Sequence, residues 1–154
     1  MIDTKFWSDP WVLGSLNPLD RYLFLYFISN EHTNISGIYE IATRTICFDT
    51  GIEEETLLKA MIPKLAPKLY YKDNWIILVN FPKHQNLKSK DVIKGIQREF
   101  EQAPKSIQEY AIGRGWGDGL GMVPPSPRIP NLTKPNLTYR ESKDSNKEKG
   151  KKKQ

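Results

Sequence analysis

The chain has 154 residues, of which 38% are hydrophobic and 27% are charged, with a net charge of +5 and one cysteine. This length allows one core of about 100 residues plus an additional segment. A single cysteine excludes an intramolecular disulfide, and the first nine residues, which include Asp3, Lys5 and Asp9, do not resemble a signal peptide. The longest apolar run, Tyr22 to Ile28, has seven residues, whereas a membrane span requires about 20. We therefore expect a cytoplasmic protein.

Aromatic residues gather at the start of the chain. Phe6-Trp7 and Trp11 predict an N-terminal arm that packs on the domain or on a second copy, which leaves a homo-oligomer open. Asn17-Pro18 then begins a helix, because Asn is a good N-cap and Pro suits the first helical position. This helix extends to about Asn30 and is apolar nearly all round, so we expect it to be the buried central helix of the core.

A short strand and a pair of helices follow. The residues from Gly37 to Ile41 alternate between apolar and polar, as a strand does. Ala42 to Leu65 reads as two helices joined at Gly51, with Thr50 and Glu53 at the spacing of a capping box. Small Cys47 would let these helices cross closely, and Pro63 must end or kink the second one. The spacing predicts a helix-turn-helix, although an ordinary packed helix pair is the alternative.

The next segment has the pattern of a β-hairpin. Leu69-Tyr70-Tyr71 and the run from Trp75 to Phe81 are rich in strand-forming residues, and the polar residues 72–74 separate them. We expect this hairpin to pair with the earlier strand in a three-stranded sheet, with Trp75 in the core. A helix-turn-helix followed directly by a hairpin is the order of a winged helix, so the predicted fold class is α+β.

Two more helices and a tail complete the predicted organisation. An amphipathic helix spans about Lys90 to Gln102, and a second begins at Pro104 and ends at Gly113. Beyond it, glycine alternates with other residues, several prolines follow, and half of residues 143–154 are lysine. We therefore predict a winged-helix domain over residues 1–112 and a disordered tail over residues 113–154.

Catalytic and cofactor motifs are absent from the sequence. His32 and His84 are far apart in the chain, and Cys47 is the only thiol, so the spacing supports neither a zinc site nor a Cys-His pair. Glycine-rich nucleotide motifs are also missing. We therefore predict a protein that is not an enzyme and that binds no cofactor.

Charge points to DNA as the partner. Residues 1–55 contain three basic and nine acidic residues, whereas residues 56–98 contain nine basic and two acidic ones. A basic surface attracts a phosphate backbone because binding releases condensed counterions, although a solvated lysine-rich face without a partner is the alternative. Three glutamates, residues 53–55, begin the second helix and would face phosphates.

We therefore expect double-stranded DNA to be held mainly by the hairpin tip, by the residues after the hairpin and by the tail. Lys90, Lys94 and Arg98 recur every fourth residue and would form one positive line on their helix. The predicted DNA-binding residues are Arg44, Lys59, Lys64, Lys68, Lys72, Asn74, Lys83, His84, Gln85, Lys88, Lys90, Lys94 and Arg98.

Three parts of the chain resemble a known family: FWSDPWVLGSLNPLDRYLFLYFISN, then NISGIYEIATRTICFDTGI, then NFPKHQN followed by KGIQREFEQAPKSI. Over about residues 3–112 they resemble the N-terminal domain of bacteriophage replication initiation proteins, or replisome organisers, which are related to DnaD-type primosome proteins. The resemblance implies a winged-helix domain that binds origin DNA in the bacterial host cell and recruits the host helicase or helicase loader. Two alternatives are a winged-helix transcriptional regulator and a module that binds a host replication protein without DNA.

Overall fold

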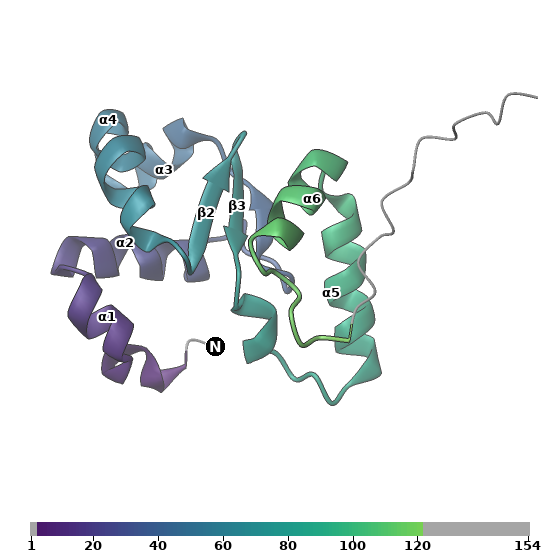
Figure 1. Cartoon of the computed structure of the whole chain (residues 1–154). Helices are drawn as coiled ribbons and strands as arrows, with labels where there is room; N and C mark the ends of the chain where they lie inside the picture. The colour runs from purple at the N-terminus through teal and green to yellow at the C-terminus, as the bar shows by residue number, and fades with distance from the viewer. Residues whose placement is uncertain (1–2, 122–154) are drawn as a thin grey trace, which may run out of the picture. The chain divides into compact units, whose positions relative to one another are not determined.

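A three-stranded antiparallel sheet separates two helical layers in the computed structural model, which describes residues 3–121 (Figure 1). Its strands are β1 (Ile38–Glu40), β2 (Leu69–Lys72) and β3 (Trp75–Leu78), in the order β1-β3-β2. Figure 1 shows α2, α3 and α4 on one side of the sheet and α5 and α6 on the other. This arrangement is α+β, and it confirms the predicted three-stranded sheet.

The hairpin turn has the conformation that its residues favour. Asp73 and Asn74 connect β2 to β3 with φ values of 50° and 65°, in the left-handed region that a two-residue hairpin turn requires. Asp and Asn tolerate this region better than other residues with a side chain. The predicted hairpin is therefore confirmed, with its register set by a turn of two residues.

The central strand β3 is buried on both faces. Ile76 and Leu78 belong to the first core cluster, together with Leu23 and Phe27 of α2 (Pro18–Ser29). Ile77 lies in a second cluster with residues of α5 (Lys90–Gln102) and α6 (Lys105–Gly113). A strand covered on both faces reads as a continuous apolar run, as residues 75–79 do.

The helix α2 begins as predicted but is not buried all round. Asn17 Oδ1 accepts a hydrogen bond from the Asp20 backbone N–H at 2.8 Å, and Asp20 Oδ2 accepts from the Asn17 N–H at 3.3 Å. Leu19 is 50% exposed and Tyr22 is 45% exposed. The helix is part of the core, as predicted, through Leu23 and Phe27, but only one of its faces is buried.

The N-terminal arm packs on α2. It consists of η1 (Thr4–Ser8) and α1 (Pro10–Ser15). The Phe6 ring stacks against Phe24 with centroids 5.8 Å apart, and Trp11 meets the same ring edge-on at 5.5 Å. This contact confirms that the arm packs on its own domain.

The turn between α3 (Thr43–Thr50) and α4 (Glu54–Thr56) follows the prediction at Gly51 but not at Thr50. Gly51 has φ 72°, and its N–H donates to the Cys47 carbonyl at 2.9 Å, which ends α3. The predicted capping box is wrong. Thr50 is still inside α3 and donates its hydroxyl to the Ile46 carbonyl at 2.6 Å, while Glu53 is the N-cap of α4 and makes no side-chain cap bond.

Helical structure continues past α4 in altered form, changes type next to Pro63 and ends at Leu65. Residues Leu57–Met61 (η2) form a wider π turn, in which the Ile62 N–H donates to the Leu57 carbonyl, and Ile62–Leu65 (η3) form a 3-10 turn. Proline lacks an N–H and its ring crowds the carbonyl one turn back. The change of helix type around Pro63 fits the predicted end or kink.

The two predicted C-terminal helices are confirmed with the predicted bounds at Lys90, Gln102 and Gly113. Packing continues past residue 112, where the domain was predicted to end, because Trp116 is buried in the second core cluster. The rest of the predicted tail, residues 122–154, lies outside the described residues. Within residues 3–121, no helix is both long and apolar enough to cross a membrane.

Candidate nucleic-acid interface

One tyrosine connects the hairpin to the start of α3. The Tyr71 hydroxyl on β2 lies 3.0 Å from each of three oxygens: Thr43 Oγ1 at the start of α3, the Ile41 carbonyl and Asn74 Oδ1 at the hairpin tip. The Ile41 N–H also donates to the Asn74 carbonyl at 2.7 Å. The hairpin tip is therefore held at a defined position next to α3.

This connection changes the expected role of Asn74. Its side-chain oxygen faces the Tyr71 hydroxyl, and its backbone supplies the left-handed turn conformation. Asn74 thus has a local structural role besides its predicted one in DNA binding.

Two of the predicted DNA-binding lysines are already paired with carboxylates. Lys59 Nζ lies 2.7 Å from Glu55 Oε1 one turn earlier, and both side chains are exposed. Lys64 Nζ lies 3.5 Å from Asp20 Oδ2, whose side chain is buried. A cation whose charge is compensated within the fold attracts a phosphate less strongly than an unpaired one.

Negative charge does gather where α4 begins. Glu53, Glu54 and Glu55 are all exposed. Of these three glutamates, only Glu55 makes an ion pair within residues 3–121. Arg44, an exposed residue of α3, makes no ion pair within the same range. The segment from α3 to α4 therefore presents both signs of charge to solvent.

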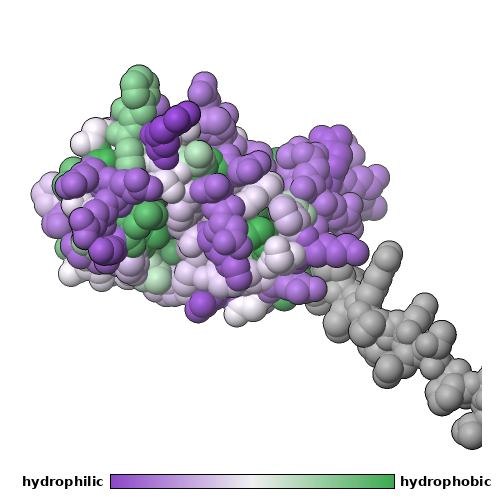
Figure 2. Space-filling view, turned by 90° about the horizontal axis from the view of Figure 1, so that it is seen from above, coloured by the Kyte–Doolittle hydropathy of each residue, from purple (hydrophilic) through white to green (hydrophobic). Residues whose placement is uncertain are grey.

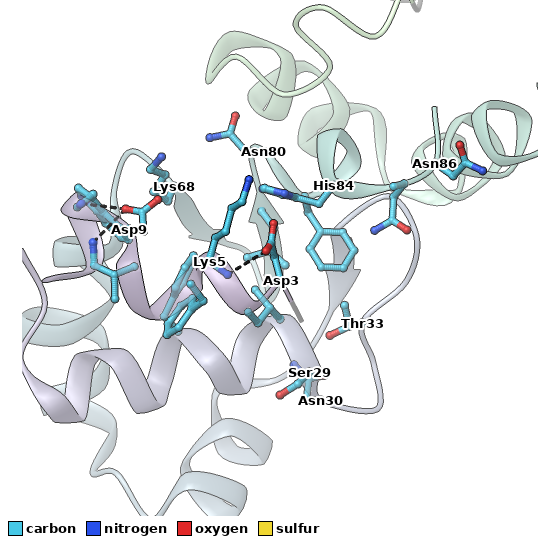
Figure 3. A pocket seen from close by; sticks show the side chains of 18 residues that line it. Asp3, Lys5, Asp9, Ser29, Asn30, Thr33, Lys68, Asn80, His84 and Asn86 are labelled. Carbon is cyan, nitrogen blue, oxygen red and sulfur yellow. Dashed lines mark hydrogen bonds between the residues drawn. The ribbon is translucent and has the colours of Figure 1, made fainter. Parts of the chain in front are cut away.

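Lys68, His84 and Gln85 come together around a groove of about 690 Å³ (Figure 3). The groove lies between the N-terminal arm, the end of α2 and η4 (Phe81–His84). Its lining includes Phe24 and Phe81, and Lys68 Nζ stands 5.8 Å from the centre of the Trp11 ring.

The groove is polar at its edge but nearly balanced in charge. Lys5 and Lys68 contribute positive charge, whereas Asp3 and Asp9 contribute negative charge. Both aspartates accept backbone hydrogen bonds as helix caps: Asp3 from Lys5 at 2.9 Å, and Asp9 from Trp11 at 2.8 Å. The groove thus offers aromatic surface and amide groups without the charge excess that would favour a phosphate.

The predicted positive line on α5 is present. Lys90, Lys94 and Arg98 are all exposed, and their spacing of four residues places them on one face of the helix. Lys83 and Lys88, in the segment before α5, are exposed as well. Ion pairs are absent from all five residues within the described part of the chain. Seen from above, hydrophilic side chains cover the side of the molecule that carries α5 and α6 (Figure 2).

A further cationic cluster lies where the hairpin meets α6. Lys72 Nζ stands 4.6 Å from the centre of the Tyr110 ring. The guanidinium carbon of Arg114 stands 4.7 Å from the Tyr70 ring and 5.0 Å from the Tyr110 ring. The structure therefore places Lys72, a predicted DNA-binding residue, against the same ring as Arg114, which was not predicted to bind DNA.

Sequence reasoning missed Arg114 because it lies among closely spaced glycines. A usable signal was nevertheless present: Gly115 directly follows Arg114, and an apolar residue, Trp116, follows the glycine. Glycine just past a helix end, followed by an apolar residue, is typical of a Schellman cap.

Titratable side chains do not form a metal centre within residues 3–121, where no group of three His, Cys, Asp or Glu residues is placed to hold an ion. Burial, with a smaller contribution from Glu54, raises the pKa of the Cys47 thiol. A raised thiol pKa disfavours the thiolate form that nucleophilic chemistry needs.

No protein-family model, curated protein or solved structure matches this chain.

Proposed function

We propose that this protein is a non-enzymatic DNA-binding protein of the winged helix-turn-helix class that acts in the initiation of bacteriophage or prophage DNA replication. The observation that carries the proposal is the fixed relation between two elements: α3 and the hairpin tip meet at the Tyr71 hydroxyl. In winged helices a helix-turn-helix and a hairpin act on DNA together, so their relative position matters.

The order of elements supports this class. The chain runs from α2 through β1, α3 and α4 to β2 and β3, and the strands lie in the order β1-β3-β2. A turn of three residues that begins with Gly51 separates α3 from α4, as expected for a helix-turn-helix.

The distribution of charge supports binding through the phosphate backbone of duplex DNA. A recognition helix contacts base edges with its first residues, but α4 begins with exposed glutamates. Cations without a carboxylate partner in the described residues lie instead on the hairpin, where Lys72 is half-buried, and after it and on α5, where they are exposed. Phosphate contacts position a protein on DNA without reading its sequence. We therefore expect affinity with modest sequence selectivity.

The role in replication initiation rests on the resemblance to replisome organisers. Two of the resembling segments meet in the fold. Gly37 has φ 71°, and a Cβ placed there would lie 2.6 Å from Phe81 Cβ, so glycine is required for this approach. The resemblance therefore includes residues that are far apart in the chain and adjacent in space. Origin DNA and the host helicase or helicase loader are the partners that it implies.

One observation favours a second function, binding to a protein partner. Phe48 on α3 is 88% exposed, and Trp7 of the N-terminal arm is 58% exposed. Exposed aromatic side chains are common anchors of protein interfaces. A module that binds a host replication protein without DNA would use such residues.

Fluorescence anisotropy of the full chain with labelled duplex and single-stranded DNA, over a salt series, tests the proposal. We expect duplex binding whose logarithm of affinity falls linearly with the logarithm of salt concentration. Two variants separate the domain from the tail: one replaces every lysine from residue 143 onward with glutamine, and the other is Lys83→Gln, Lys94→Gln and Arg98→Gln.

Duplex binding that survives loss of the tail lysines and weakens in the triple variant supports a DNA-binding domain. Binding that depends on the tail lysines alone would assign the attraction to the tail, and absence of binding would contradict the proposal.

A further inference from the structure

We propose that Lys72 and Arg114, held against Tyr70 and Tyr110, form a binding site for a backbone phosphate of DNA, so that the end of α6 belongs to the DNA interface. This inference rests on the proposed function and extends it to a residue outside the helix-turn-helix and the hairpin. It assigns the two cations one ligand, a phosphodiester group of duplex DNA.

The two cations both lie against one ring. Lys72 Nζ is 4.6 Å and the Arg114 guanidinium carbon is 5.0 Å from the centre of the Tyr110 ring. The Lys72 nitrogen and the Arg114 guanidinium carbon are therefore no further apart than the sum of their distances to the ring centre. The Tyr70 ring meets Tyr110 edge-on, with centroids 6.2 Å apart, and also contacts the guanidinium. Tyr110 thus contacts both cations, and Tyr70 contacts the guanidinium alone.

Carboxylates do not neutralise this pair within the described residues. Asp73 follows Lys72 in the turn, Glu109 precedes Tyr110 on α6, and Asp118 follows Arg114 by four residues. Ion pairs to Lys72 or Arg114 are absent among residues 3–121. Like charges that contact the same ring without a counter-ion repel each other, and a bound anion relieves that repulsion. Arginine is also suited to phosphate because its planar donors can form two parallel hydrogen bonds.

Arg114 is positioned by a cap that is anchored in the core. Gly115, with φ 87°, donates its N–H to the Ile112 carbonyl at 3.0 Å, and the Trp116 N–H donates to the Ala111 carbonyl at 3.0 Å. These two bonds form a Schellman cap, in which Arg114 is the C-cap residue. Trp116 is buried next to it, so the backbone of Arg114 is fixed from both sides.

Preorganisation favours binding. Lys72 lies on a strand, Arg114 lies at a capped helix end, and the rings restrict both side chains. Side chains that are already ordered lose less conformational entropy when they bind a ligand. Figure 1 shows α6 beside the hairpin, on the side opposite α3 and α4. The hairpin therefore has the helix-turn-helix on one side and the Lys72–Arg114 pair on the other.

Charge-removing variants of the full chain test the site. Arg114→Gln and Lys72→Gln are compared with Lys105→Gln, which removes the same charge from the exposed first residue of α6. The readout is the slope of the logarithm of affinity for labelled duplex DNA against the logarithm of salt concentration. We expect Arg114→Gln and Lys72→Gln each to reduce the magnitude of this negative slope by about 0.9, the contribution of one phosphate contact. Lys105→Gln keeps the slope of the unmodified protein, and Arg114→Lys keeps most of it because the charge remains.

Failure of this inference is distinguishable from failure of the proposed function. If the unmodified protein binds duplex DNA, and Arg114→Gln and Lys72→Gln have the same slope as Lys105→Gln, the proposed site is wrong while DNA binding stands. If Arg114→Lys loses as much slope as Arg114→Gln, charge is not what Arg114 contributes, and the phosphate assignment is overturned. If the unmodified protein does not bind DNA, both proposals fail. Thermal melting of each variant, followed by circular dichroism, identifies any loss of slope that comes from unfolding, and an unfolded Arg114→Gln is replaced by Arg114→Met as the test.

Discussion

The indole Nε1 of Trp116 donates a hydrogen bond to the backbone carbonyl of Ser36 at 2.9 Å, although 80 positions separate the two residues. The same indole stacks on Phe100, with ring centroids 4.3 Å apart and planes 8° from parallel. Ser36 is itself buried just before β1. The residues after α6 are therefore attached to the loop that leads into the sheet.

Truncation tests this attachment. A chain ending at Gly113 loses Trp116, and we expect its free energy of unfolding to fall by about 3–5 kcal/mol, the usual cost of removing a large buried aromatic side chain. Urea denaturation followed by tryptophan fluorescence measures the change. A chain ending at Gly121 keeps the contact and is the control. Equal stability of the two truncated chains would contradict the structural role of Trp116.

Two glycines with similar backbone conformation provide a matched pair. A Cβ at Gly51 meets nothing within 4 Å, so Gly51→Ala should cost only the conformational penalty of the left-handed region, about 1–2 kcal/mol. At Gly37 a Cβ would also lie 2.6 Å from Phe81 Cβ, so Gly37→Ala should cost clearly more. Gly14, in α1, has a negative φ and an open surrounding, so Gly14→Ala is the control and should be neutral or stabilising. Chemical denaturation of the three variants would refute this ranking if Gly51→Ala proved the most damaging.

Removal of the Tyr71 hydroxyl should loosen the hairpin. Tyr71→Phe leaves the Thr43, Ile41 and Asn74 oxygens without this partner, and we expect a loss of about 1–2 kcal/mol. Tyr22→Phe is the control, because Tyr22 is half exposed and makes no side-chain hydrogen bond within residues 3–121. Thermal unfolding gives the stability, and amide hydrogen exchange at the hairpin tip gives the local effect. Unchanged exchange in Tyr71→Phe would show that the hydroxyl does not hold the tip.

The thiol of Cys47 predicts a dependence on pH. Burial raises the pKa of this thiol above its ordinary value of about 8.5, so the folded chain has less thiolate than the unfolded chain at the same pH. The contribution to stability is present below the ordinary pKa and is lost as the pH rises above it. Alkylation by iodoacetamide between pH 7 and 10 should therefore have its midpoint at higher pH for the native protein than for the protein in urea. Coincident midpoints would contradict the shift.

The glutamates of α4 provide a prediction for DNA affinity that rests on the proposed function. Glu53→Gln with Glu54→Gln removes two exposed negative charges that have no ion pair within residues 3–121. We expect duplex DNA to bind several-fold more tightly at low salt, because repulsion of the phosphates falls. Glu31→Gln, in the loop after α2, is the control. An unchanged affinity would mean that α4 does not face the DNA.

Local patterns predicted most of the secondary structure because each depends on neighbouring residues. The helix starting at Pro18 follows from its Asn17 cap, and the end of α3 follows from Gly51. The bounds of α5 and α6 follow from the spacing of apolar residues. The Thr50 prediction failed for an equally local reason, since its hydroxyl bonds back to α3 instead of forward to α4.

The candidate site was predictable only as a set of cations. Composition identified the excess of lysine and arginine, and the helical period placed Lys90, Lys94 and Arg98 together. Neither signal showed that Lys64 pairs with Asp20, which is 44 positions earlier in the chain. Arg114 was assigned to the predicted tail because the glycines around it are typical of disordered segments. The burial of Trp116 cannot be seen from composition.

The sequence by itself determined the α+β class, the three-stranded sheet and the order of its elements, because caps, turns and hydrophobic periods act over a few residues. Only the tertiary structure decided which cations of residues 3–121 remain unpaired, that Lys72 and Arg114 both contact Tyr110, and that Trp116 joins the core. These contacts join residues that are far apart in the chain, and their energies depend on distances that exist only after folding. A linear pattern carries no record of those distances.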